Sequence, residues 1–406
     1  MLSSSQTTSR ERTRTILSKS ARQRLGMYAA PLIGGCAARP RQQPAAARWE
    51  LGAMFESKTV FIVGAGASHE VGFPVGAKLT EQIADVLGPV NYIPAGLHYV
   101  NNVPRAMSRA VNGLIKGPDQ IRTDAIEDAC HRIKVAMPGV VSIDNFIDLH
   151  SSNRAVEMIG KIAISYCILR AENNSRLAFD RSNIYNRLPL TKVADTWYQR
   201  LFRLAAEGGS AESPSGIFSN LSFVVFNYDR AVEHFLFEAF HEVIGLEEKI
   251  ALDTVKMIPI YHPYGTVGTL PQWDVGTSVQ FGADPDTQPI DLLETSRAIR
   301  TFTEQTGDVS IITEIKEIIK SAETIVFLGF GFNSQNMDLL SQQNPINTKR
   351  IFATGVGMST SDANVVRYQI KNALKVQLAV DEIVVENTTC CGLFDAYSRS
   401  LPSEVS

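Results

Sequence analysis

The stretch KTVFIVGAGASHEVGFPVGAKL, residues 58–79, decides the fold because it joins an apolar run to a glycine-rich turn and then to a helical pattern. The apolar run is typical of a strand buried on both faces. At the turn, Gly64 and Gly66 carry no side chains, so backbone N–H groups can approach a phosphate, and the positive end of the helix near Pro74 and Lys78 favours its charge. The stretch therefore predicts a phosphate site. A tight strand–helix turn without a ligand is the alternative.

Four further segments share the character of the first run: each is short, apolar and rich in β-branched or aromatic residues, and a turn containing Gly, Asn or Asp follows it. They are residues 221–227, 256–262, 323–331 and 350–357. Such runs, most of them followed by helical patterns, are typical of a parallel sheet covered by helices. We expect an α/β fold with a doubly wound, mostly parallel, Rossmann-like sheet.

Residues 88–220 contain almost no strand-like pattern, whereas apolar residues recur there at helical spacing. We therefore expect a helical insertion after the first strand–helix unit, within one domain that covers residues 54–406.

Residues 1–53 form a leader of different composition. Its first 50 positions hold nine Arg or Lys residues against two Glu residues, although the whole chain has a formal charge of -3. A disordered tail, an organelle transit peptide and a misassigned start upstream of Met54 all fit this leader. Because a strand is expected a few residues after Met54, we favour Met54 as the start. The acidic remainder lacks the clustered cations of a nonspecific nucleic-acid binder, so no direct nucleic-acid binding is expected.

Cysteine usage and hydropathy bear on the compartment. The chain has five cysteines, an odd number without a CxxC pair, which favours a reducing compartment over a disulfide framework or a zinc ribbon. No run approaches the roughly 18 consecutive apolar residues of a membrane span. We therefore expect a cytoplasmic protein that binds neither a metal nor a membrane.

The spacing after the first glycines disfavours a hydride-transferring oxidoreductase. Such a domain has a second strand that ends in Asp or Glu about 20 residues past the glycines, where the carboxylate holds the ribose hydroxyls. Counting from Gly64 reaches Asp85, which lies in the helical pattern LTEQIADVL.

The segment FVVFNYDRAVEHFL places Asn227 and Asp229 directly after a predicted strand and before a predicted helix. Because the carboxyl ends of strands in open α/β sheets face the ligand crevice, both side chains are candidates for contact with a cofactor. The alternative is plain helix capping, which both residue types favour. We assign capping more weight for Asp229 than for Asn227.

Three further turns follow predicted strands. In IPIYHPYGTVG, His262 and Tyr264 lie at a strand end, where His262 is a candidate acid–base group. In IVFLGFGFNSQNMDLL and ATGVGMSTSDANVV, glycines again follow a strand, and Asn333 or Ser334 caps the next helix. We expect a long ligand across this edge of the sheet, in contact with Gly329, Phe330, Ser334 and Gly355.

The order GAGAS, GFP, FNYD, a strand ending in HxxG, and GFGF resembles the sirtuin-like family of NAD-consuming enzymes. It is most similar to the bacterial branch found in anti-phage defence, which includes the Thoeris NADases, and the resemblance covers about residues 57–375. It implies that the GAGAS loop binds NAD phosphates, that the Asn of NYD is catalytic, that a His near the HG motif is the base, and that the SID motif supplies a supporting Asp. Carried over, these are Gly64, Ala65, Gly66, Ser68, Asn227 with Asp229, His262 and Asp144.

The chain departs from the family in two ways. It lacks the four closely paired cysteines of the deacetylase zinc ribbon, which disfavours protein deacetylation. Where the family has His directly before Gly, this chain has Tyr264, with His262 two residues earlier. Because residues two apart on a strand face the same side, we expect both side chains to reach the crevice.

We expect an NAD glycohydrolase of bacterial anti-phage defence that cleaves NAD, as its substrate, to nicotinamide and ADP-ribose. Asn227 orients the ribose and water, Asp229 stabilises the positive charge that builds on the ribose, and His262 or Tyr264 serves as the base. A homo-oligomer or a defence partner protein is expected to supply the trigger. The alternative is a catalytically inactive sensor of NAD or ADP-ribose.

Overall fold

The computed structural model describes residues 54–88, 103–181, 183, 185–273, 276–305 and 309–403. The predictions for the leader, residues 1–53, lie outside this part of the chain. Among the described helices, none has both the length and the apolar character that crossing a bilayer requires.

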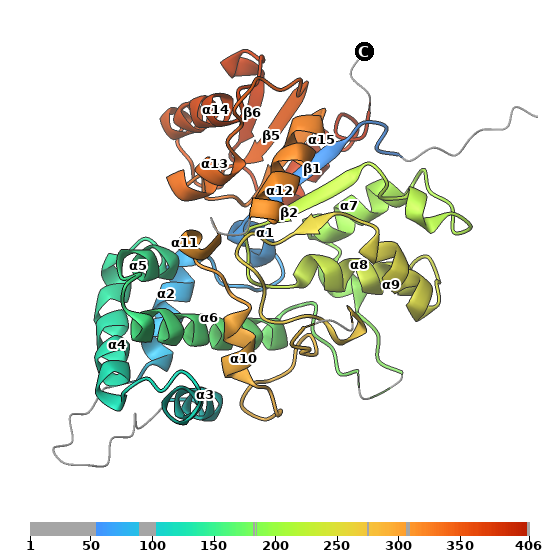
Figure 1. Ribbon diagram of the computed structural model, residues 1–406. Coiled ribbons are helices and arrows are strands. Elements are labelled where there is room, and N and C mark those ends of the chain that lie inside the picture. Colours follow the sequence, from blue (N-terminus) through green and yellow to red (C-terminus); the bar gives the residue numbers. More distant parts are fainter. Residues whose placement is uncertain are drawn as a thin grey trace, which may run out of the picture. The chain divides into compact units, whose positions relative to one another are not determined.

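A six-stranded sheet, parallel throughout, forms the centre of the described domain (Figure 1). The strand order is β3-β2-β1-β4-β5-β6, so the chain starts in the middle, builds outward to one edge, and then crosses back to build the other half. This is the order of the doubly wound Rossmann fold. The strands are β1 (Thr59–Val63), β2 (Leu221–Val225), β3 (Ile260–Tyr261), β4 (Thr324–Leu328), β5 (Arg350–Thr354) and β6 (Ile383–Glu386).

The central strands β1 and β4 are buried at every position, which explains why their sequences are continuous apolar runs. Their registers align, because Thr59 pairs with both Leu221 and Thr324. The carboxyl ends of β1, β2 and β4 therefore lie at one level of one edge.

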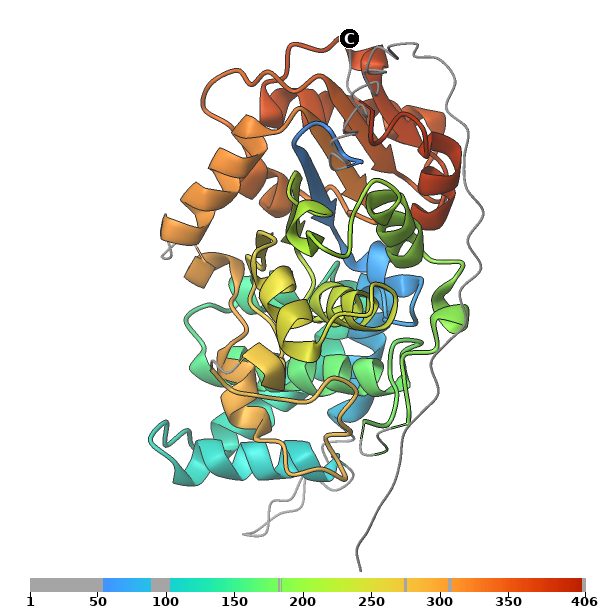
Figure 2. The same ribbon diagram turned by 90° about the vertical axis from the view of Figure 1, so that its right-hand side faces the viewer.

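Helices cover both faces of the sheet. Figure 2 shows α12 on one side of the strands and α7 and α15 on the other. Phe61 on β1 stacks on Phe394 of α15 with ring centroids 6.1 Å apart, which places the first strand against the last helix. The helices are α1 (Ala65–His69), α2 (Gly76–Val86), α3 (Arg105–Lys116), α4 (Thr123–Ala136), α5 (Ile143–Leu149), α6 (Arg154–Asn174), α7 (Trp197–Ala206), α8 (Ala231–Glu242), α9 (Glu248–Lys256), α10 (Leu292–Arg297), α11 (Phe302–Gln305), α12 (Val309–Ser321), α13 (Ser334–Leu340), α14 (Thr360–Leu374) and α15 (Cys390–Tyr397).

The described residues between α2 and β2 form helices and irregular segments, as the expected helical insertion requires. Its central element is α6, which is buried on nearly all sides because α2, α3, α4, α5 and α10 pack around it. Asn153 caps the start of α6 by accepting hydrogen bonds from two backbone N–H groups.

A buried ion pair joins α6 to the start of α8. Glu172 and Arg230 have exposed fractions of 0% and 2%, and the Arg230 Nε donates to Glu172 Oε1 at 3.1 Å. Arg230 also donates to the carbonyl oxygen of Val279 at 2.6 Å, so the guanidinium is satisfied on several sides. This pair fixes the backbone immediately after Asp229.

Glu70, just after α1, holds the first turns of two distant helices. Its Oε2 accepts from the N–H of Trp197 at the start of α7, and its Oε1 accepts from the N–H of Cys391 in α15, both at 2.8 Å. Helix N-termini leave N–H groups without intrahelical partners, and a carboxylate there is favoured by the helix dipole. Burial raises the pKa of Glu70 despite these hydrogen bonds.

Candidate active site

The topology places the candidate site at the carboxyl ends of β1 and β4. The chain builds toward opposite edges from these two neighbouring strands, and in open α/β sheets ligands bind at such a switch point. Gly64 follows β1 and Gly329 follows β4, so both predicted glycine turns lie here.

The two glycine turns touch each other. A Cβ atom added to Gly64 would lie 2.6 Å from the carbonyl oxygen of Gly329, and one added to Gly66 would lie 2.8 Å from the Gly329 Cα. Gly329 has a φ of +55°, and its own Cβ would lie 2.1 Å from the Ala67 nitrogen. Glycine is thus required at all three positions by backbone contact between the turns.

The turn–turn contact also occupies backbone donors. Gly64 N–H donates to the Leu328 carbonyl at 2.9 Å, and Gly66 N–H donates to the Gly329 carbonyl at 3.0 Å. A tight structural turn, the alternative stated from the sequence, therefore explains these glycines without a ligand. Their predicted phosphate contacts stay a prediction, and in this conformation those two N–H groups already have partners.

Asn227 extends from the end of β2 to the glycine turn. Its Nδ2 donates to the Gly64 carbonyl at 3.1 Å and to the Ser68 hydroxyl at 2.9 Å. Because a carbonyl only accepts, the nitrogen side of the amide must face Gly64. Two predicted motifs, 163 residues apart in the chain, thus share direct hydrogen bonds.

Asp229 lies beside this network and is 3% exposed. Burial raises its pKa to about 6, against the opposing effect of hydrogen bonds from the Ala231 N–H and the Ser68 hydroxyl. The Ala231 contact, at 3.1 Å, is the expected capping role at the start of α8. A carboxyl group with a pKa near neutrality is suited to proton transfer as well.

His262 has an acceptor at each ring nitrogen. Nδ1 lies 3.2 Å from the carbonyl oxygen of Asn227, and Nε2 lies 2.7 Å from Oε1 of Glu233. Burial alone lowers the pKa of His262, but the Glu233 carboxylate and the Asn227 carbonyl outweigh it and raise the pKa above its ordinary value. Acceptors therefore face both ring nitrogens, an arrangement that favours the doubly protonated imidazole.

Tyr264 lies in a different cluster from His262. The strand ends at Tyr261 and residues 262–265 form a turn, in which the Gly265 N–H donates to the His262 carbonyl at 3.0 Å. The expectation that the strand continues through His262 and Tyr264 is therefore wrong, and the reason to expect both side chains on the same side falls with it. The Tyr264 hydroxyl donates instead to Asn336 Oδ1 of α13 at 2.7 Å.

Asp144 and Phe330 lie near Tyr264. The hydroxyl of Tyr228 donates to Asp144, and burial raises the pKa of this carboxyl group. The Phe226 ring packs between Tyr264 and Phe330, with centroid distances of 5.9 and 5.0 Å. The SID motif and residues that follow three strands, β2, β3 and β4, thus meet in one cluster, which is largely aromatic.

Four predicted residues have no hydrogen bond to this network. Ala65 begins α1, Ser334 is exposed after the cap Asn333, and Gly355 donates its N–H to the Glu386 carbonyl at 2.7 Å. Pro74 lines a separate cavity of about 330 Å³ that also contacts α2 and α6, with Lys78, Gln82, Asp85, Tyr166, Arg170 and Asn174 among its lining residues.

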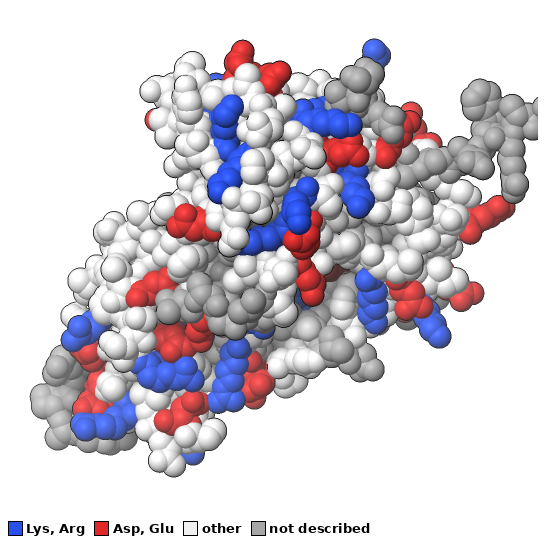
Figure 3. Space-filling model, turned by 45° about the horizontal axis from the view of Figure 1, so that its top comes forward, with Lys and Arg blue, Asp and Glu red and all other residues white. Residues whose placement is uncertain are grey.

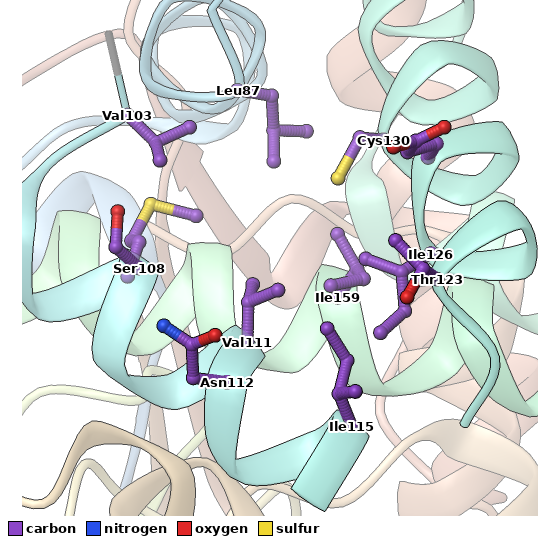
Figure 4. Close-up of a pocket in the computed structure, with 12 residues that line it drawn as sticks. Leu87, Val103, Ser108, Val111, Asn112, Ile115, Thr123, Ile126, Cys130 and Ile159 are labelled. Carbon is purple, nitrogen blue, oxygen red and sulfur yellow. The ribbon is translucent and has the colours of Figure 1, made fainter. Parts of the chain in front are cut away.

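Another cavity, of about 50 Å³, lies inside the helical insertion (Figure 4). Side chains of Leu87, Val111, Ile115, Cys130 and Ile159 surround it; Leu87 directly follows α2, and the others come from α3, α4 and α6. Sites for cofactors have volumes of roughly 300–1,000 Å³, so this cavity is far too small for a dinucleotide.

Three residues of the site were not predicted from the sequence. Glu233 holds His262, Tyr198 of α7 lies 3.3 Å from the Ser68 hydroxyl, and Asn336 holds Tyr264. Of these three residues, only Glu233 could have been found from the sequence, because it lies in the first turn of the helix that follows the FNYD motif. No group of His, Cys, Asp and Glu suited to a metal ion occurs among the described residues.

Charged side chains are mixed in sign over the face shown in Figure 3, where Lys and Arg lie interspersed with Asp and Glu.

Fold and site together define a class: a doubly wound α/β protein of Rossmann-like topology, with an Asn-Tyr-Asp motif held against the first glycine turn. No protein-family model matches the sequence, and no curated protein matches it.

Proposed function

We propose that the chain is an NAD glycohydrolase that uses water to cleave NAD into nicotinamide and ADP-ribose, in the setting of anti-phage defence. The observation that carries the proposal is the contact of Asn227, at the end of β2, with Gly64 and Ser68 of the first glycine turn. The resemblance to the sirtuin-like family predicts that these motifs act on one dinucleotide, and the doubly wound fold supports this prediction.

Cleavage of the bond between nicotinamide and ribose builds positive charge on the ribose. In the proposal, Asp229 stabilises that charge, Asn227 orients the ribose and the attacking water, and the water's second proton leaves with a base. For His262 to be that base, it must first pass a proton to Glu233 or to solvent, since both of its nitrogens face acceptors in this conformation.

A catalytically inactive NAD or ADP-ribose sensor is the second candidate, and the occupied nitrogens of His262 favour it. One experiment separates the two functions: purified protein is incubated with NAD, and free nicotinamide is measured by chromatography. The hydrolase releases nicotinamide, and Asn227→Ala lowers turnover about 10²-fold or more while the melting temperature shows whether the variant is folded. If calorimetry shows NAD binding but no nicotinamide is released, even when a candidate partner is added, the result supports the sensor. If the protein neither binds NAD nor releases nicotinamide, both proposed functions are rejected.

A further inference from the structure

Glu233 contacts His262 from the first turn of α8 and is not among the residues predicted for the site. Its side chain is 15% exposed and that of His262 is 10% exposed, so solvent and salt screen the pair weakly. The positive end of α8 favours the ionised carboxylate. The other oxygen, Oε2, is buried without a hydrogen-bond partner in the described part of the chain, which leaves His262 as the main partner of this charge.

Glu233 and His262 form the start of a chain of contacts that ends at the glycine turn. Glu233 accepts from Nε2 of His262, and the Nδ1 of His262 donates to the main-chain carbonyl of Asn227. The side-chain amide of the same residue donates to Gly64 and Ser68. Since the amide nitrogen faces inward, Oδ1 of Asn227 faces the other way. No hydrogen bond to this oxygen occurs within the described ranges, so it remains for a ligand hydroxyl or water.

We propose that Glu233 is a positioning residue of the candidate site: by accepting the Nε2 proton of His262, it keeps the Nδ1 proton on the main-chain carbonyl of Asn227. It thereby holds the backbone at the end of β2, from which the Asn227 side chain reaches the glycine turn. A neutral imidazole has one proton to share between two nitrogens. Without the Glu233 charge, the Nε2 tautomer becomes accessible and the contact with Asn227 is lost.

Other charges around the pair do not replace Glu233. Asp229 faces His262 from the connection between β2 and α8, without a hydrogen bond to the ring. Arg230 lies at the start of α8, but Glu172 neutralises it. Glu233 is thus the carboxylate in direct contact with the imidazole.

The test follows the ring nitrogens of His262 by NMR in ¹⁵N-histidine-labelled protein, with the signal assigned from His262→Asn. The wild type, Glu233→Gln and Glu247→Gln are titrated. Glu247 is exposed at the start of α9, so Glu247→Gln makes the same Glu-to-Gln change away from His262 and serves as the matched control. We expect the His262 midpoint to fall by about one pH unit or more in Glu233→Gln and to stay unchanged in Glu247→Gln. An unchanged midpoint in Glu233→Gln overturns the proposal.

A second variant keeps the test decisive if Glu233→Gln does not fold. Glu233→Asp retains the charge but shortens the reach, so we expect a smaller fall of the His262 midpoint; the same midpoint as in the wild type overturns the proposal in that case.

The kinetic arm rests on the proposed function. With NAD as the probe, Glu233→Gln should lower kcat about tenfold with KM changed less than twofold. If the wild type releases no nicotinamide, the proposed function fails, whereas the NMR titration still decides the role of Glu233.

Discussion

Asp229 carries its carboxyl group where water has little access, so the protonation of this residue contributes to the pH dependence of stability. The pKa is raised from 3.8 to about 6 in the folded chain. A raised pKa means that the folded state holds the proton more tightly. The stabilisation is therefore fully present below about pH 4 and is lost as the pH rises through about 6.

Asp229→Asn should remove this part of the pH dependence. The unfolding free energy at pH 4 minus that at pH 7 should be about 2 kcal/mol lower in the variant than in the wild type, because one pKa unit corresponds to about 1.4 kcal/mol and pH 4 already lies slightly above the unfolded pKa. Urea unfolding at both pH values measures it. Asp253→Asn, at an exposed position of α9, is the control and should leave the difference unchanged. Equal pH dependence of Asp229→Asn and wild type would contradict the prediction.

Single residues of the site were predictable where their position in the fold determines which groups they contact. Asn227 and Asp229 follow a buried strand, and their meeting with the glycine turn follows from parallel strands ending at one edge. The partners of His262 were not predictable in this way. The orientation of α8 brings Glu233 to His262, and a turn sends Tyr264 to a different cluster; neither feature leaves a periodic pattern in the sequence.

At the scale of the elements, the contact between the two glycine turns predicts how a substitution there changes packing, independently of ligand binding. Gly66→Ala places a Cβ atom 2.8 Å from the Gly329 Cα, which is backbone and cannot rotate away. We expect a loss of about 1–3 kcal/mol in unfolding free energy, measured in urea without any nucleotide.

Gly76→Ala is the matched control for that substitution. Gly76 starts α2, and an added Cβ meets nothing within 4 Å, so alanine should be neutral or stabilise the fold by up to about 1 kcal/mol. Wild-type stability of Gly66→Ala would show that the turns can separate at little cost, and the glycine would then be free for a role in binding.

Among the elements, the sequence predicted the central strands best. Continuous apolar runs identify strands buried on both faces, as in β1 and β4. The strands at the two edges of the sheet were harder to predict. The segment β6 was missed because its residues alternate between buried and half-buried, and residues 256–262 were predicted as a strand although α9 extends to Lys256 and only Ile260–Tyr261 pair.

Across the whole domain, Glu70 links parts of the chain that are far apart in sequence. Glu70→Gln replaces one carboxylate oxygen by an NH₂ group, which then faces a backbone N–H of α7 or α15. An unpaired buried donor costs about 1–3 kcal/mol, and because Glu70 is half-buried we expect a loss of about 1 kcal/mol in unfolding free energy.

Glu81→Gln serves as the control in the same urea titration. Its partner Lys78 is exposed, and exposed pairs contribute about 0–1 kcal/mol. Equal effects of the two substitutions would mean that Glu70 does not hold the helices.

The short edge strand β3 has a consequence for behaviour at high concentration. Sheet edges usually present rows of unpaired N–H and C=O groups, to which a strand of another molecule can add. Here the edge is two residues long, and Pro259 and Pro263, which lack N–H groups, bracket it. Two residues supply too few hydrogen bonds to template another strand. This edge is therefore protected against amyloid-like stacking by the residues that end it.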